Sequence, residues 1–167
     1  MKIFVFSAFV LLNLILQATI FPAFTFGGVK PDLLLIIVVF AALLKGTATG
    51  VKVGFFVGLA QDILSGKFIG LFMLSKMLTG LCVGLVESKI FKENYLVPIV
   101  ILFLATILHE FLFMFFGDLI GRTAYWAQGW TSVVLPLAIY HACIGPFLYV
   151  PAYKVYVKWW RNKDNEA

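Results

Sequence analysis

The chain has 167 residues, of which 62% are apolar and only 13% are charged. An ordinary soluble domain is about 45–50% apolar and about 25% charged, and a globule of this size cannot bury so large an excess of apolar surface. The composition therefore excludes a soluble enzyme, a disordered tail and a nucleic-acid-binding module. The net charge of +5 fits loop lysines that orient a chain in a membrane and contact anionic lipid.

Six apolar segments follow one another along the chain. We expect each to form a helix, because backbone groups in hydrocarbon must be hydrogen-bonded within their own segment. The first segment is too long for a typical signal peptide, and no A-x-A-like cleavage site follows it, so we interpret it as a retained span. Together the six predict a single transmembrane domain over residues 1–167. The predicted segments are 3–21, 31–44, 51–64, 68–86, 96–116 and 131–157.

The second and third segments are short for a bilayer that needs about 20 residues per helix. They can thin the membrane locally, borrow flanking residues or form a re-entrant pair. Six full crossings is the preferred interpretation, and four crossings plus a re-entrant hairpin is the alternative.

The basic residues indicate the orientation. With the N-terminus in the cytoplasm, nine lysines and arginines fall on inner loops and tails and three on outer loops, which fits the positive-inside rule. The chain is therefore expected to have both termini inside. The inner residues are Lys2, Lys45, Lys52, Lys89, Lys92, Lys154, Lys158, Arg161 and Lys163; the outer ones are Lys30, Lys67 and Arg122.

Glycines recur at every fourth residue through the third segment. Gly50, Gly54 and Gly58 form a ridge without side chains, and Gly80 and Gly84 continue the pattern in the fourth segment. Small residues let membrane helices approach closely and gain packing energy. The pattern predicts a tight hairpin of the third and fourth segments. The alternative is that part of the ridge accepts a helix from a partner protein.

Several polar side chains are predicted to lie at membrane depth, where each ionisable group is costly. Counting about 1.5 Å per residue from the segment ends places most of them in the outer half, on four helices. The members of this polar cluster are Gln17, Gln61, Asp62, Lys76, His109 and Glu110, with His141 nearer the middle.

Mutual pairing is the first interpretation of the polar cluster, with Lys76 bound to Glu110 or Asp62. A solvated outward-facing pocket and an ion pathway are the alternatives. Asp32 has a separate explanation, because it follows Pro31 at the start of a helix, where a carboxylate complements the helix dipole. Asp62 lies near a helix C-terminus and gains nothing from that dipole.

Catalytic motifs are largely missing. His109 and Glu110 begin like the zinc-protease motif H-E-x-x-H, but position 113 is Phe, so the second zinc ligand is missing. No G-x-S-x-G or phosphate-binding loop occurs. We therefore expect no catalytic residues, no metal and no cofactor.

The stretch from Pro31 to Gly84 resembles the rod shape-determining protein MreD family. The resemblance rests on P-D opening a helix, a G-x-x-x-G pair, D-x-x-S-G and a later glycine, while beyond Glu87 it rests on hydropathy and length alone. The family-motif residues are Pro31, Asp32, Asp62, Gly66 and Gly70. Lys76 and the His109–Glu110 pair are not hallmarks of the family.

The resemblance implies a non-enzymatic, multi-pass subunit of the cell-elongation machinery in the bacterial inner membrane. Proteins like MreD work with MreC, with the filament protein MreB, and with the peptidoglycan synthase pair of RodA and a class B penicillin-binding protein. The family also resembles the six-helix S-components of energy-coupling-factor transporters, which bind small molecules toward the outside. A scaffold that docks partner helices is thus the expected function, and a vitamin-binding S-component is the alternative.

Overall fold

The computed structural model describes residues 30–66, 69–89, 96–121 and 129–157, and these residues are helical with short turns between. The first predicted segment, 3–21, and Gln17 lie outside the described residues. The elements are α2 (Leu33–Lys45), α3 (Thr47–Ser65), α4 (Leu71–Val86), the short 3-10 turn η2 (Glu87–Lys89), α5 (Leu96–Leu119), the π-helical turn η3 (Trp130–Val134) and α7 (Leu135–Tyr156).

Each of the five later predicted segments contains a helix, with shifted ends. The largest shifts are of four residues: α3 begins at Thr47, before the predicted 51–64 segment, and α7 begins at Leu135, after the predicted start at 131, where the π-helical turn η3 precedes it. Gly46 has φ +82° and separates α2 from α3. The number of crossings and the positions of the termini stay predictions.

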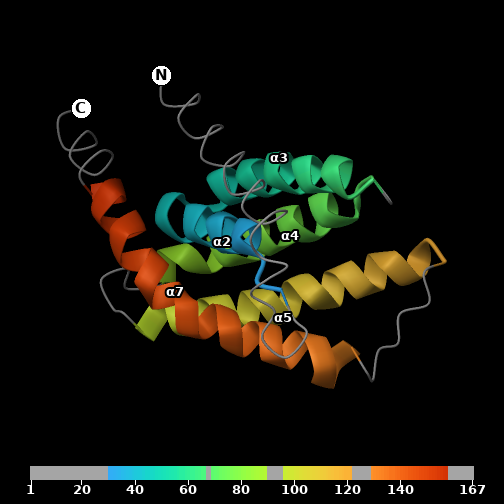
Figure 1. Ribbon diagram of the computed structural model, residues 1–167. Helices are drawn as coiled ribbons and strands as arrows, with labels where there is room; N and C mark the ends of the chain where they lie inside the picture. Colours follow the sequence, from blue (N-terminus) through green and yellow to red (C-terminus); the bar gives the residue numbers. More distant parts are fainter. Residues whose placement is uncertain (1–29, 67–68, 90–95, 122–128, 158–167) are drawn as a thin grey trace.

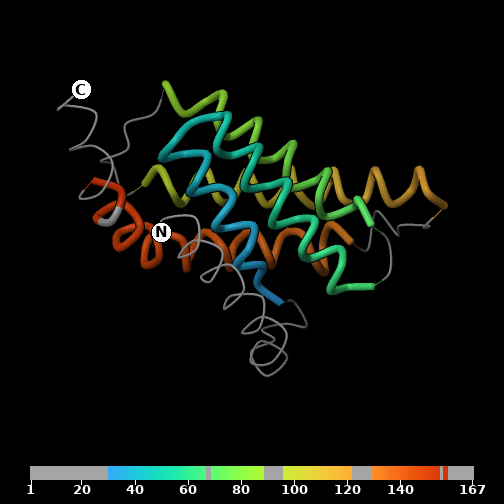
Figure 2. The backbone as a smooth tube through the Cα atoms, turned by 90° about the horizontal axis from the view of Figure 1, so that it is seen from above, coloured from blue at the N-terminus to red at the C-terminus, as the bar shows by residue number. Residues whose placement is uncertain are grey.

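The described helices form two layers (Figures 1 and 2). Helices α2, α3 and α4 make one layer, and α5 and α7 make the other. Successive helices run in opposite directions, so that α2, α4 and α7 point one way and α3 and α5 the other. The short α2 begins partway along α5 and α7, and residues far apart in sequence meet at that level.

Helix α2 is the centre of the bundle and contacts α3, α4, α5 and α7. Nine of its 13 residues are buried, and Leu34, Leu35, Val38 and Val39 are fully so. A helix that is apolar on every side is typical of a protein core or a membrane span, and α2 is covered by its neighbouring helices. At about 1.5 Å per residue α2 is about 20 Å long, which is shorter than the roughly 30 Å hydrocarbon core.

The hairpin of α3 and α4 is confirmed, and the glycines occupy its contact. A Cβ atom on Gly54 would lie 2.6 Å from the backbone oxygen of Lys76, and one on Gly58 would lie 2.5 Å from Cα of Met73. Gly50 and Gly80 face each other, and Gly84 lies against the backbone at Thr47. This chain's own helices therefore cover the whole ridge, and the alternative that the ridge docks a partner helix is wrong.

Helix α5 and the Trp130–Lys154 stretch are long and apolar enough to cross a membrane. Only 22% of the apolar stretch of α5 and 33% of that around α7 is buried inside the protein. The core helix of a soluble protein would be mostly buried. Large apolar side chains such as Leu104 and Phe147 instead face outward, and the chain is a helical membrane protein.

The glycine contact predicts a sharp response to a single methyl group. Gly54→Ala should lower the free energy of unfolding by about 1–3 kcal/mol, because overpacking separates α3 from α4. Ala48→Leu is the matched control, since it adds more bulk to α3 at an exposed position. Thermal unfolding in detergent measures both. Equal melting temperatures for the two variants would contradict the close backbone contact.

Candidate functional site

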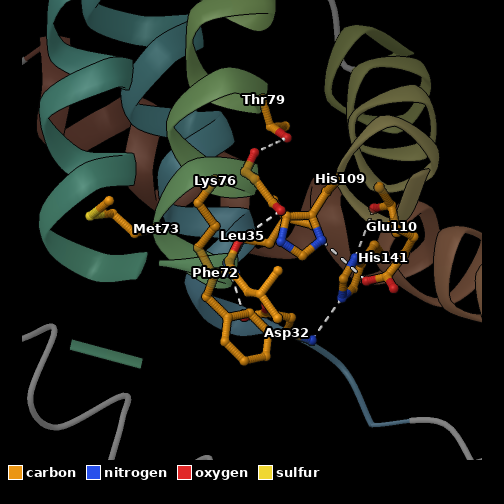
Figure 3. A network of polar contacts seen from close by, with 12 residues as sticks. Asp32, Leu35, Phe72, Met73, Lys76, Thr79, His109, Glu110 and His141 are labelled. Carbon is orange, nitrogen blue, oxygen red and sulfur yellow. Dashed lines mark hydrogen bonds and ion pairs between the residues drawn. The ribbon is translucent and has the colours of Figure 1, made fainter. Parts of the chain in front are cut away.

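The polar residues of the bundle gather where α2 begins (Figure 3). Asp32 from α2, Lys76 from α4, Thr106 and His109 from α5 and His141 from α7 are all at most 7% exposed. Thr106 and His109 lie near the middle of α5, and the short α2 begins partway along α5 and α7, so these residues meet inside the bundle. We call these five residues the buried polar network.

Lys76 forms a buried ion pair with Asp32. Its Nζ atom donates to Oδ2 of Asp32, and the lysine side chain is fully buried. The ammonium also lies 5.8 Å from the centroid of the Phe72 ring, within the range of a cation–π contact. The prediction that Lys76 pairs with Glu110 or Asp62 is therefore wrong. In the sequence analysis Asp32 is assigned to the helix start alone and is not considered as a partner of Lys76, whereas α2 begins inside the bundle, next to Lys76.

Asp32 also caps α2, as the Pro31–Asp32 pattern predicts. Its Oδ1 atom accepts a hydrogen bond of 3.0 Å from the backbone N–H of Leu35. The first N–H groups of a helix have no partner within the helix, and a capping carboxylate satisfies one of them. One carboxylate thus uses one oxygen for the helix start and the other for the lysine.

His141 connects the start of α2 to the layer formed by α5 and α7. Its Nε2 atom accepts from the backbone N–H of Asp32 at 2.9 Å, and its Nδ1 atom lies 2.9 Å from Oγ1 of Thr106. Thr106 donates its hydroxyl hydrogen to the carbonyl oxygen of Leu102 at 2.6 Å. The Thr106 oxygen must then accept from His141, so the ring is neutral with its hydrogen on Nδ1. The chain of bonds joins α2, α5 and α7.

Asp62 has a different partner from the one expected. Its carboxylate accepts three backbone N–H bonds, from Gly70 at 2.9 Å and from Phe72 and Met73 at 3.0 Å each. These groups begin α4, whose N-cap Gly70 has no side chain to offer. The expectation that Asp62 gains nothing from a helix dipole is wrong: it lies at the C-terminus of α3 and caps the N-terminus of α4.

The D-x-x-S-G motif follows from the same geometry. The backbone carbonyl of Asp62 accepts from the N–H of Gly66 at 3.1 Å, which ends α3. Gly66 has φ +62° and Gly70 has φ +114°, values that favour glycine. One aspartate and two glycines therefore end one helix and start the next.

His109 and Glu110 form a pair of their own. Nδ1 of His109 lies 3.1 Å from Oε1 of Glu110, and the His109 ring stacks on Phe113. Neither residue is paired with Lys76. Gln61 precedes Asp62 on α3 and is not part of the buried polar network.

Of the predicted polar cluster, only Lys76 and His109 belong to the buried polar network. The other three members are Asp32, which the sequence analysis assigns to helix capping alone, His141, which it sets apart from the cluster, and Thr106, which it does not name. The signal for Thr106 was weak, since a threonine in an apolar helix usually bonds the carbonyl four residues back, as it does here. Its position one turn of α5 before His109 was the available clue.

The arrangement is suited to holding helices together. Lys76, Asp32 and His141 bond to one another, to the Thr106 hydroxyl or to the backbone. Within the described residues, no three His, Cys, Asp or Glu side chains come together to hold a metal ion. The network fixes the depth at which α2, α4, α5 and α7 meet.

The ion pair predicts a coupled response in a double-mutant cycle. Lys76→Met should lower the free energy of unfolding by about 3–5 kcal/mol, because it leaves a buried carboxylate without its cation. Asp32→Asn keeps the cap, so the double variant should lose much less than the sum of the single losses. Thermal or denaturant unfolding measures the cycle. The pair Lys76→Met and Glu110→Gln is the control and should be additive.

The Asp62 cap predicts a local effect on α4. Asp62→Asn replaces one acceptor oxygen by an amino group that can only donate, against N–H groups that need an acceptor, and should cost about 1–3 kcal/mol of stability. Hydrogen exchange at the backbone N–H groups of Phe72 and Met73 should become faster. Asp118→Asn, at the exposed end of α5, is the matched control. Unchanged exchange in the Asp62 variant would contradict the cap.

Comparison with known proteins gives one match. A family model described as rod shape-determining protein MreD matches residues 1–159 of the 167-residue chain. No curated protein and no solved structure matches the chain significantly. The match covers the helices that build the buried polar network, as well as the motif residues Pro31, Asp32, Asp62, Gly66 and Gly70. The chain belongs to the MreD family of rod shape-determining proteins.

Proposed function

We propose that this protein is a non-enzymatic scaffold subunit of the bacterial cell-elongation complex, embedded in the inner membrane as a multi-pass bundle. Its role is to dock transmembrane helices of partners and thereby position peptidoglycan synthesis. MreC is the first partner, and MreB and the RodA–class B penicillin-binding protein pair complete the complex. Family membership over residues 1–159 supports a role in rod shape.

The engagement of the buried charged groups within the bundle is the observation that carries the scaffold role. The ammonium of Lys76 and the carboxylates of Asp32 and Asp62 all bind groups within the bundle. A reactive centre would need such groups directed at a substrate. Here they hold helices in register, so the surface that remains for recognition is the apolar outside.

Helix α5 offers the best docking face on that outside. The glycine ridge is occupied within the chain, and α5 is the longest described helix and the less buried of the two spanning stretches. Val100, Leu104, Phe115 and Leu119 are between 44% and 69% exposed. Residues 4 and 11 apart lie on one side of a helix, so these four form a single stripe, which we call the α5 stripe.

The six-crossing topology with both termini inside is part of the proposal. The alternating directions of α2, α3, α4, α5 and α7 support it, and the excess of lysine on the predicted inner loops agrees. With this topology the buried polar network lies toward the periplasmic side. A transmembrane helix of MreC then meets the α5 stripe within the membrane.

Depletion of the protein in its host, followed by complementation, tests the proposal. Depletion should cause loss of rod shape, and the wild-type chain should restore it. A variant with Leu104→Ala and Phe115→Ala should co-purify much less MreC, because the large side chains that fill the helix contact are gone. Phe147→Ala, on the outward face of α7, is the matched control and should co-purify MreC normally.

Other outcomes separate the alternatives. Normal cell outlines with a new nutrient requirement would contradict the scaffold and favour a small-molecule S-component. Rod loss with equal co-purification of MreC by all variants would keep the shape role and reject the α5 stripe as the docking face.

A further inference from the structure

The outward sides of α3 and α5 differ in apolar length. Helix α5 exposes large apolar side chains from Leu96 to Leu119, a length of about 36 Å at 1.5 Å per residue. On α3 the exposed polar residues Lys52 and Ser65 bound the apolar part of the outward side, which is only about 20 Å long. The hydrocarbon core of a bilayer is roughly 30 Å thick. The α5 side is long enough to span it, and the α3 side is not.

Contacts within the bundle place the short apolar side between the ends of the long one. Asp62, near the end of α3, accepts from the backbone N–H of Phe72 at 3.0 Å, and the Phe72 ring lies 4.7 Å from the Phe113 ring of α5. Asp62 and Phe113 are therefore at about the same level. Beyond this level α3 continues for three residues and α5 for six. In the other direction Lys52 is about 15 Å away, while α5 continues for about 26 Å.

The remaining geometry leaves this difference in place. Helix α4, the other half of the hairpin, has 16 residues and is about 24 Å long. Figures 1 and 2 both show α5 extending beyond the end of α3. A short apolar segment adapts by thinning the bilayer, by long polar side chains that reach the interface, or by association with another protein. Lys52 can reach toward one interface, but Ser65 is too short to do so at the other end.

The outward side of α3 is better suited to lipid than to another helix. Membrane helices associate through small residues, and the glycines within α3 already lie against α4 and α2. Its outward side instead carries the bulky Phe55 and Phe56 together with the charge of Lys52. A second helix on this side would bury that charge, whereas lipid headgroups leave it solvated.

We propose that the protein thins the bilayer on one side only: lipid along α3 is compressed to its short apolar length, while lipid along α5 keeps its full thickness. The proposal rests on the crossing of the membrane by α3 and α4, which is part of the proposed topology. It does not depend on the docking of MreC.

Spin labels at matched levels of α3 and α5 test the proposal. The native free thiols Cys82 and Cys143 are first replaced by alanine, and the full chain with one label at a time is reconstituted in dioleoyl phosphatidylcholine vesicles. In each pair the α3 label should be several-fold more accessible to a water-soluble nickel chelate than the α5 label, and less accessible to oxygen, which concentrates in hydrocarbon. The pairs of exposed positions are Leu64→Cys with Phe115→Cys at one end and Ala48→Cys with Val100→Cys at the other.

The other outcomes each overturn the proposal. Equal accessibility within both pairs would mean a bilayer of uniform thickness. An α3 label that is shallower at one end and deeper at the other would mean a tilt of the whole bundle. A Leu64 label deep in hydrocarbon would mean a re-entrant hairpin, and α3 labels shielded from both reagents would mean a protein contact such as a second copy of the chain. Co-purification of MreC is a separate measurement, so the scaffold role is tested independently.

Lys52→Leu tests the cause of the thinning. Without the charge the apolar part of α3 is longer, so the difference between the Ala48 and Val100 labels should shrink. Lys154→Leu is the matched control, because it removes an exposed charge from the last turn of α7, and should leave the difference unchanged. With Lys52 in place, the difference should grow as the lipid chains lengthen from myristoleoyl to erucoyl. A difference that responds neither to Lys52→Leu nor to chain length would overturn the proposal.

Discussion

A helix that begins inside an apolar bundle must bring hydrogen-bond partners for its first N–H groups, and the rest of this structure depends on how α2 does so. Asp32 caps the helix with one carboxylate oxygen and binds Lys76 with the other. The N–H of Asp32 itself donates to His141. Because these groups are buried among the helices, each is satisfied only if α2, α4 and α7 meet at one height. The polar contacts therefore fix the position of these helices along one another, which apolar packing alone does not determine.

The glycine contact and the ion pair depend on each other. Gly54 lies against the backbone oxygen of Lys76, so the lysine side chain leaves α4 away from α3 and reaches α2. Asp62 fixes where α4 begins by holding the N–H groups of Phe72 and Met73. A shift of α4 by one turn would move Lys76 by about 5.4 Å and leave two buried charges unpaired. The glycines thus let α3 and α4 pack closely, and the charged residues fix the position of α4 along its neighbours.

The helices and the α3–α4 hairpin could be predicted because their causes are local: apolar runs, a proline–aspartate start and glycines at helical spacing. The partner of Lys76 could not. Depth estimates assumed that every helix begins at the membrane boundary, whereas α2 is 13 residues long and begins within the bundle. Asp32 is therefore deeper than its position in the sequence suggests. A charge pair between α2 and α4 depends on how deep each helix lies in the folded bundle, and residue spacing along the chain does not reveal this.

The same constraint bears on what an MreD-family protein of this kind can recognise. Charges that hold the bundle together are unavailable for partners, since removing one leaves its counter-charge buried at a cost of about 3–5 kcal/mol. In the docking role that we propose, recognition in the membrane comes from the shape of outward apolar faces, where association depends on van der Waals packing rather than on a hydrophobic driving force. Such packing requires a rigid surface. A network that locks α5 to α2 and α7 through Thr106 and His141 supplies that rigidity directly behind the exposed face of α5.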